Sequence, residues 1–153
     1  MDDTVRLVVF VLDGQRHAIP LAQVEQVTLA ARVTPVPGAP GIVLGLLDLR
    51  GQAIPVLDVR RRNAADSPAL RLSDQFLVVR TRLRILALRV DDTLGVAERD
   101  ARAVSSLRLA ASQQARTAVL QLDDGLVLID DVEGFLSGHE GRLLDEALAA
   151  GSP

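Results

Sequence analysis

The chain contains no cysteine, which excludes disulfide bonds, thiolate catalysis and metal sites with cysteine ligands. It also has no tryptophan, no tyrosine and no lysine, and phenylalanine occurs only three times. With so few aromatic rings, platforms that stack nucleic-acid bases or sugars are not expected. The hydrophobic core must therefore be built mainly from valine, leucine, isoleucine and alanine.

Neither sign of charge is in large excess. The 153 residues include 17 basic and 20 acidic side chains, for a formal net charge of −3, and 48% of them are hydrophobic. This composition is typical of one globular domain and predicts no bulk affinity for nucleic acid. The acidic start, MDDTVRLVVF, lacks the basic residues of a signal peptide, and no apolar run is long enough to span a bilayer. We therefore expect a cytoplasmic protein without direct membrane insertion.

Strand patterns dominate the chain. Residues 5–12 and 16–20 flank Asp13-Gly14 and predict a hairpin. Residues 118–130 alternate around Asp124-Gly125, which is the strongest hairpin signal in the sequence. Further strands are predicted over residues 46–49, 52–59, 75–81 and 85–90.

Helical signals are short. Leu21, Val24 and Val27 are spaced three apart, which predicts a helical turn that passes into a strand. Pro40 suits the first turn of a short helix through Leu44, and residues 103–114 permit another. The last residues predict two short helical pieces interrupted at Gly138, the second with an apolar stripe that either docks on its own domain or serves a partner: Leu143, Leu144, Ala147 and Leu148.

Short strands at close spacing with few helices predict an all-β fold of small barrels. We expect a single domain over residues 1–153, made of two intertwined lobes. The polar loop near residues 61–73 is the predicted division between them.

Recognisable catalytic patterns are lacking. His17 and His139 are far apart and have no acidic or hydroxyl neighbours in a triad pattern, so we interpret both as incidental. Aspartate doublets at 91–92, 123–124 and 130–131 could hold Mg²⁺, but neighbours on a strand point to opposite faces, and turns explain the doublets better. No catalytic, metal or cofactor site is predicted, and an enzyme that uses a carboxylate-bound divalent metal stays as an alternative.

The stretch GLLDLRGQAIPVLDVR, which begins at Gly45, places Arg50-Gly51 between Asp48 and Asp58 in an apolar run. Gly51 allows a bend there. Arg50 either presents its planar fork of donors to a partner or neutralises Asp48 or Asp58 within the fold. Gly45 is interpreted either as part of a binding surface or as a residue that permits close packing of the preceding short helix on the sheet.

This stretch resembles the signature of CheW-type chemotaxis adaptor domains, in which a glycine precedes Asn-x-Arg-Gly, an aliphatic residue, a proline and an Asp-Leu-Arg-like ending. The matching positions are Gly45, Arg50, Gly51, Pro55, Asp58 and Arg60. The resemblance continues in family order over FVLDGQRHAIPLAQVEQV, VTPVPGAPGIVLG, LRVDDTLGV and DDGLVLIDDVEGFLS, which together cover nearly the whole chain.

The resemblance implies two SH3-like five-stranded β-barrel subdomains with short connecting helices and a C-terminal helix. It implies an adaptor without catalytic activity or cofactor. Its partners would be the cytoplasmic domain of a chemoreceptor (a methyl-accepting chemotaxis protein) and the regulatory domain of a CheA-type histidine kinase. The protein would then be cytoplasmic and associated with membrane receptor arrays.

The same resemblance assigns residues to two surfaces. The receptor-facing residues are Gly45, Arg50, Gly51, Thr93 and Val96, and the residues that face the kinase or a neighbouring adaptor are Leu21, Val24 and Gln26. From their spacing alone, Leu21 and Val24 are equally suited to the core. Asp48 stands in place of the usual asparagine, Gln26 where an acidic residue is common, and Thr93 in a usually aliphatic place. These departures keep a second alternative open, a paralogous adaptor in a pili or second-messenger pathway.

Overall fold

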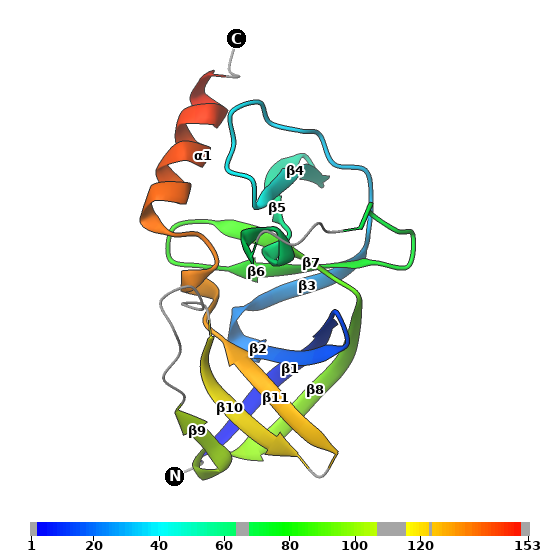
Figure 1. Cartoon of the computed structure of the whole chain (residues 1–153), viewed down its shortest axis with the longest axis vertical. Coiled ribbons are helices and arrows are strands. Elements are labelled where there is room, and N and C mark those ends of the chain that lie inside the picture. Colours follow the sequence, from blue (N-terminus) through cyan, green and yellow to red (C-terminus); the bar gives the residue numbers. More distant parts are fainter. Residues whose placement is uncertain (1–2, 64–67, 107–115, 123, 151–153) are drawn as a thin grey trace.

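The computed structural model describes residues 3–63, 68–106, 116–122 and 124–150, and this part of the chain is mostly β (Figure 1). The strands are β1 (Thr4–Leu12), β2 (Gln15–Pro20), β3 (Val24–Leu29), β4 (Val43–Leu49), β5 (Gln52–Leu57), β6 (Gln75–Arg80), β7 (Ile85–Val90), β8 (Asp92–Asp100), β9 (Val104–Ser106), β10 (Arg116–Leu122) and β11 (Gly125–Asp130). The helical segments are the short 3₁₀ turns η1 (Leu21–Gln23), η2 (Val59–Asn63), η3 (Ala101–Ala103) and η5 (Val132–Gly134), and the helix α1 (Gly138–Ala150).

Within these described residues the strands form two sheets. One has the order β8-β1-β2-β11-β10-β9 and the other β3-β6-β7-β5-β4. Neighbours run antiparallel except for one parallel pair in each sheet, β2 with β11 and β5 with β7. The predicted fold class, mostly β with two lobes and a C-terminal helix, is confirmed. The first sheet has six strands rather than five because the three-residue β9 pairs with β10 at its edge.

In each sheet, one edge strand directly follows a hairpin that belongs to the other sheet. The chain leaves the β1–β2 hairpin of the six-stranded sheet and enters the five-stranded sheet as β3, and it leaves the β6–β7 hairpin and returns as β8. The chain thus crosses from one sheet to the other after β2 and again after β7. The polar segment 61–73, which was predicted to divide two lobes, connects β5 to β6 of the same sheet. The polarity of a loop does not indicate which strands pair on either side of it.

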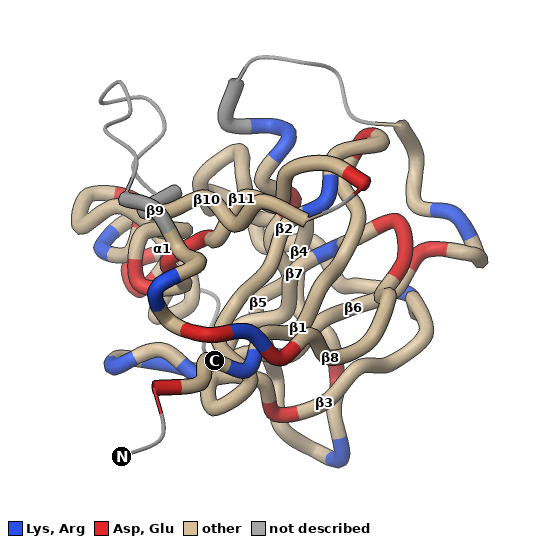
Figure 2. Tube along the Cα trace, turned by 90° about the horizontal axis from the view of Figure 1, so that it is seen from below, with Lys and Arg blue, Asp and Glu red and all other residues tan. Residues whose placement is uncertain are grey.

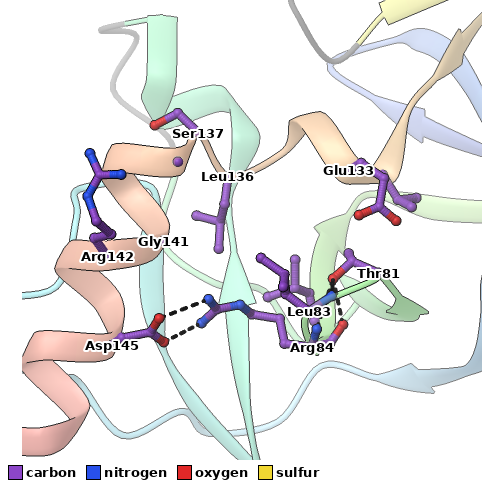
Figure 3. Close-up of a pocket in the computed structure, with 12 residues that line it drawn as sticks. Thr81, Leu83, Arg84, Glu133, Leu136, Ser137, Gly141, Arg142 and Asp145 are labelled. Atoms are coloured by element: carbon purple, nitrogen blue, oxygen red, sulfur yellow. Dashed lines mark hydrogen bonds and ion pairs between the residues drawn. The ribbon is translucent and has the colours of Figure 1, made fainter.

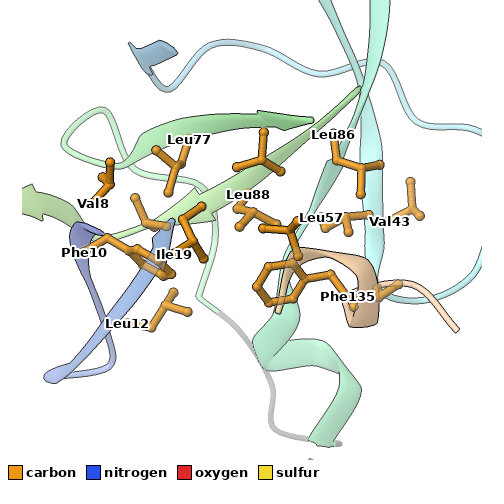
Figure 4. Close-up of a cluster of buried hydrophobic side chains, with 14 of the residues drawn as sticks. Val8, Phe10, Leu12, Ile19, Val43, Leu57, Leu77, Leu86, Leu88 and Phe135 are labelled. Atoms are coloured by element: carbon orange, nitrogen blue, oxygen red, sulfur yellow. The ribbon is translucent and has the colours of Figure 1, made fainter. Parts of the chain in front are cut away.

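A shared apolar core lies between the two sheets (Figure 4). Phe10 enters it from β1, Leu77 and Leu88 from β6 and β7, and Phe135 and Leu144 from the C-terminal segment. Two further clusters lie on the other faces of the sheets. The central strands are buried on both faces, which explains why they read as continuous apolar runs rather than alternating ones.

The helix α1 packs on its own domain. Leu144 and Ala147 are buried, and Leu148 packs against the shared core. The first of the two interpretations of the terminal stripe is therefore confirmed. None of the helices in the described part of the chain has the length and apolar character that crossing a bilayer requires.

Three sequence predictions of local structure need comment. The helix from Pro40 to Leu44 is wrong: one turn, with the Val43 N–H donating to the Pro40 carbonyl at 2.9 Å, leads straight into β4. The pairing of Val43 with Leu57 of β5 takes the place of further helical turns. The irregular segment after residue 90 is the long strand β8, whose many exposed residues obscure its period. The helix over 103–114 falls largely on residues 107–115, outside the described residues, and its start lies in η3 and β9 instead.

Candidate protein-interaction surface

Arg50 and Gly51 form the two-residue turn between β4 and β5. Their φ angles, +54° and +85°, are both in the left-handed region that a type I′ hairpin turn requires. The Gly51 N–H donates to Asp48 Oδ1 at 2.9 Å and so fixes the turn. A left-handed arginine costs roughly 1–2 kcal/mol. The fold therefore holds Arg50 at an exposed turn despite an unfavourable backbone conformation.

The interpretation that Arg50 neutralises Asp48 or Asp58 is wrong. Asp48 accepts the Gly51 N–H, and Asp58 is buried against Arg60 and Arg89. Among the residues that the structure describes, no carboxylate forms an ion pair with Arg50. Its guanidinium is exposed, with its donors available to another molecule.

Gly45 is buried in β4, next to the point where Thr34 pairs with Leu46. A Cβ on Gly45 would lie 2.5 Å from the carbonyl oxygen of Thr34, which is closer than real Cβ atoms approach. Gly45 thus lets the segment that follows β3 reach β4 and close the sheet. The close contact that requires glycine here is made by the extended segment at Thr34 and Pro35, not by a short helix as the packing interpretation had it.

The end of the motif lies in the interior. Arg60 Nε donates to Asp58 Oδ1 at 3.1 Å, and Asp58 Oδ2 accepts from Arg89 Nη1 at 3.2 Å, with all three residues buried. Burial alone would lower the pKa of Arg60, but Asp58, Asp13 and Asp91 raise it above its ordinary value and keep the guanidinium charged. Removing one member of a buried pair leaves an uncompensated charge, so these residues stabilise the fold. The motif therefore divides into an exposed turn and a buried ion pair.

Thr93 and Val96 lie on β8, at the free edge of the six-stranded sheet. Thr93 pairs with Phe10 and Val96 with Val8, and both partners belong to the shared core. A register shift between them leaves Leu94 without a paired residue. Leu94 is 53% exposed and Val96 58%, so this edge presents two aliphatic side chains to solvent.

The edge strand β3 also exposes two aliphatic side chains, those of Val27 and Leu29. Val27 pairs with Leu77 of the shared core, and Leu29 follows on the same face of the strand. Val27 is 42% exposed and Leu29 72%. In both Figure 1 and Figure 2, β3 and β8 lie next to each other. We term the exposed aliphatic side chains on these two strands the seam surface: Val27, Leu29, Leu94 and Val96.

Of the seam surface, only Val96 is a predicted site residue. Val27, Leu29 and Leu94 are aliphatic residues in strand-like runs, and such residues are expected in a core. Their exposure follows from the edge positions of β3 and β8, which no local pattern reveals. The alternation of Gln26, Val27, Thr28 and Leu29 would predict the opposite faces, with the aliphatic pair buried, so the sequence did not indicate this surface.

The predicted kinase-facing residues do not share one face. Leu21 in η1 and Val24 in β3 pack, partly buried, against the shared core. Gln26 instead pairs with Val78, which belongs to the cluster on the other face of that sheet. A register shift between Val24 and Gln26 produces this change. Leu21 also borders an open hollow of about 840 Å³ together with Pro20.

A smaller hollow of about 330 Å³ lies between the β6–β7 turn and α1 (Figure 3). Arg84 donates to both carboxylate oxygens of Asp145, at 2.9 and 3.3 Å, and Glu133 accepts the backbone N–H of Arg82. These polar groups are thus paired with one another. They tie the turn to the C-terminal segment rather than presenting a reactive group.

His17 has a partner that its sequence neighbours do not indicate. Its Nδ1 lies 2.9 Å from Asp130 Oδ2, both residues are buried, and its ring stacks on Phe10 with centroids 5.6 Å apart. The parallel pairing of β2 with β11 brings the two together. Throughout the described ranges, no group of three His, Cys, Asp or Glu side chains is placed to hold a metal ion. The described members of the acidic doublets serve in turns, caps and ion pairs.

These features define a class of protein. It is a binding module of two β-sheets between which the chain crosses twice, with buried ion pairs and with aliphatic side chains exposed on edge strands. Residues 6–140 match the family model of the CheW-like domain, and the chain belongs to this family. CheW scaffolding proteins act in chemotaxis as non-enzymatic adaptors. The alternative of a metal-dependent enzyme is therefore set aside.

Individual relatives cover most of the chain. It is 22% identical over 140 residues to the chemotaxis protein CheW of Klebsiella aerogenes, covering 90% of this chain and 84% of that protein. It is 23% identical over 137 residues to the chemotaxis protein CheW of Rhizobium meliloti, covering 88% of each. The crystal structure of the scaffolding protein TtCheW from Thermoanaerobacter tengcongensis superposes with a TM-score of 0.79 at 20% identity, over 89% of this chain and 90% of that one.

Proposed function

We propose that this protein couples the cytoplasmic tip of a chemoreceptor to a histidine kinase, in the cytoplasm at membrane receptor arrays. The observation that carries the proposal is the seam surface, in which two edge strands from different sheets expose aliphatic side chains next to the shared core. Exposed apolar surface of this kind marks contacts with other proteins. An amphipathic helix of a receptor is a suitable partner, because such a helix binds through an apolar stripe that can cover exposed aliphatic side chains.

Further receptor contacts are proposed at the β4–β5 turn. Arg50 has no ion partner among the described residues, and arginine is enriched among the residues that dominate binding energy. Gly51 and Asp48 hold the turn, and Gly45 supports the strand behind it. An asparagine in place of Asp48 would accept the same hydrogen bond through its Oδ1. This departure from the family pattern therefore leaves the turn intact and adds a negative charge beside Arg50.

The kinase regulatory domain is proposed to bind around η1 and the start of β3. Leu21, Val24 and Gln26 lie there, and the hollow of about 840 Å³ beside Leu21 provides a concave surface with apolar lining residues. The proposed kinase surface would use the start of β3 and the seam surface its end, so two partners would share this strand. A paralogous adaptor of another pathway would use the same surfaces with a different receptor.

The test is binding of a soluble cytoplasmic fragment of a chemoreceptor from the same genome, measured by titration calorimetry. Leu29→Ser and Val96→Ser should each weaken binding about ten-fold, the effect of truncating an interface residue worth about 1.4 kcal/mol. Leu72→Ser is the matched control, because Leu72 is 94% exposed but lies in the loop before β6.

Unchanged affinity in both seam variants would show that the receptor binds elsewhere. If the unaltered protein bound neither the receptor fragment nor a kinase regulatory domain, the coupling function itself would be refuted. Receptor fragments from the different chemosensory pathways of one genome distinguish the main adaptor from a paralogue, since only the cognate fragment should bind tightly.

A further inference from the structure

A network of charged side chains joins the β1–β2 turn and the β7–β8 corner to the interior of the five-stranded sheet. We term it the inter-sheet network, and its members are Asp13, Asp58, Arg60, Arg71, Asp74, Arg89 and Asp91. Asp58, Asp74 and Arg89 are almost completely buried. Ion pairs at such positions need near-complete compensation to be tolerated, so the geometry of the network is constrained.

Hydrogen bonds donated by backbone N–H groups attach the β7–β8 corner to the six-stranded sheet, and no arginine takes part in them. The Asp91 N–H donates to the Val11 carbonyl at 2.9 Å, and the Asp13 N–H donates to Asp91 Oδ2 at 2.8 Å. The corner and the β1–β2 turn therefore behave as one unit of that sheet. What remains to be fixed is the position of this unit against the five-stranded sheet.

Arg60 makes that connection. Its Nη1 lies 3.2 Å from Asp13 Oδ1 and 3.1 Å from Asp91 Oδ1, while its Nε is held by Asp58 Oδ1 at 3.1 Å. The side chain of Arg60 is only 6% exposed. Arg71 also reaches Asp91 Oδ1, at 3.0 Å, but its side chain is 52% exposed, so solvent weakens that contact. Arg60 is thus the buried tie between the two sheets at this corner.

We propose that Arg60 is a positioning residue for the seam surface. By holding Asp13 and Asp91 while anchored on Asp58, it sets the corner from which β8 starts and so the spacing of β8 from β3. A surface held in its binding geometry loses less conformational entropy when a partner binds. The inference rests on the proposed function, because it assigns the seam surface to a receptor.

Three variants separate positioning from simple destabilisation. Arg60→Lys keeps the positive charge but loses the planar fork that reaches three carboxylates. Asp13→Asn alters a side chain that is 64% exposed, and asparagine tolerates the left-handed φ of +51° at this position. Ile54→Val is the control: Ile54 is buried in a different cluster, so this change lowers stability without touching the network.

Two measurements are made on each variant. Because the chain has no cysteine, Glu25→Cys and Glu98→Cys place a spin-label pair on β3 and β8, and pulsed electron resonance gives their distance distribution. The second measurement is the affinity for the receptor fragment. Arg60→Lys should broaden the distribution and weaken binding about ten-fold, which corresponds to about 1.4 kcal/mol. Asp13→Asn should act in the same direction with a smaller effect, and Ile54→Val should change neither quantity.

An unchanged distance distribution in both network variants would overturn the proposal. It would also be overturned if their affinities matched that of Ile54→Val, since Arg60 would then contribute stability alone. Absence of binding by the unaltered protein would refute the receptor-coupling function instead, while the distance measurement would still decide whether Arg60 positions β8.

Discussion

Arg50 and Arg60 are ten positions apart in one motif, yet they meet opposite physical demands. Arg60 is buried and pairs with three carboxylates through Nε and Nη1, and these contacts offset most of its cost of desolvation. Arg50 lies on a tight turn in a left-handed conformation and has no partner carboxylate among the described residues. Strained backbone at an exposed polar residue is a feature of functional sites. At the scale of the residue, we therefore expect Arg50 to serve binding, whereas Arg60 serves the structure.

Reversing the charge of Arg50 tests this distinction. Arg50→Glu should weaken binding of the receptor fragment about ten-fold or more, as expected for a central interface arginine, and should leave the melting temperature unchanged. Arg82→Glu, at the exposed β6–β7 turn, is the matched control for a change of net charge. A lower melting temperature with unaltered affinity would instead make Arg50 a structural residue.

At the scale of the element, β3 and β8 have the same status in the two sheets. Each is an edge strand that directly follows a hairpin of the other sheet, and the pairing of each with its neighbour contains a register shift. Exposed edges invite aggregation unless they are bulged or charged. The charged residues at the end of β8 and its bulge give this protection, while the aliphatic residues nearer its start stay available to a partner.

The helix α1 depends on a capping box that gives a second prediction at this scale. Ser137 Oγ accepts the Glu140 N–H at 3.0 Å, and Glu140 Oε1 accepts the Ser137 N–H at 2.9 Å. Ser137→Ala should lower the free energy of unfolding by about 1 kcal/mol, because an orphan donor of the first turn loses its acceptor. Urea denaturation followed by far-UV circular dichroism measures the change. Ser137→Thr should retain most of the stability, and equal losses in both variants would argue against the cap.

At the scale of the whole molecule, the two sheets share one core and one buried charge network. Phe10 and Leu77 meet in the core although they belong to different sheets, and Asp13 and Arg60 meet in the network. Unfolding one sheet would expose both the apolar surface and the buried charges of the other. We therefore expect the described part of the chain to unfold in one cooperative transition.

The network makes this stability sensitive to acid. Burial alone would raise the pKa of Asp74, but the Arg71 N–H and the guanidinium groups of Arg89 and Arg71 lower it below its ordinary value of about 3.9. A carboxylate with a lowered folded-state pKa stabilises the fold fully above its unfolded pKa and loses that contribution as the pH falls through the folded value. We expect the free energy of unfolding to decrease as the pH drops below about 5.

Asp74→Asn tests the origin of this acid sensitivity. At neutral pH it should cost about 3–5 kcal/mol, because Arg89 is left buried with one partner fewer. Its stability should then fall less steeply than that of the unaltered protein between neutral and acid pH. Asp145→Asn, in an exposed pair with Arg84, should change stability by less than about 1 kcal/mol and keep the steep slope. Parallel slopes for all three proteins would exclude Asp74 as the source.

Local chemistry accounts for much of the fold that the sequence alone indicates. The hairpins at Asp13-Gly14 and Asp124-Gly125 follow from turn residues between apolar runs, and the structure forms both. The motif around Arg50 indicated a bend, and its glycine supplies the required positive φ. The class of function was indicated by the family resemblance of this motif, whose residues lie within one hairpin and its short continuation.

The sequence by itself determined the strands, the turns and the absence of cysteine chemistry, because each depends on residue types within a few positions of one another. Only the tertiary structure decided which strands pair. Parallel pairing set His17 beside Asp130, 113 residues away, and strand exchange brought β3 and β8 together. These contacts are chosen by the burial of whole sheets against each other. That is why aliphatic residues of the kind that predict a core remain exposed at two edges, where we propose that a partner binds.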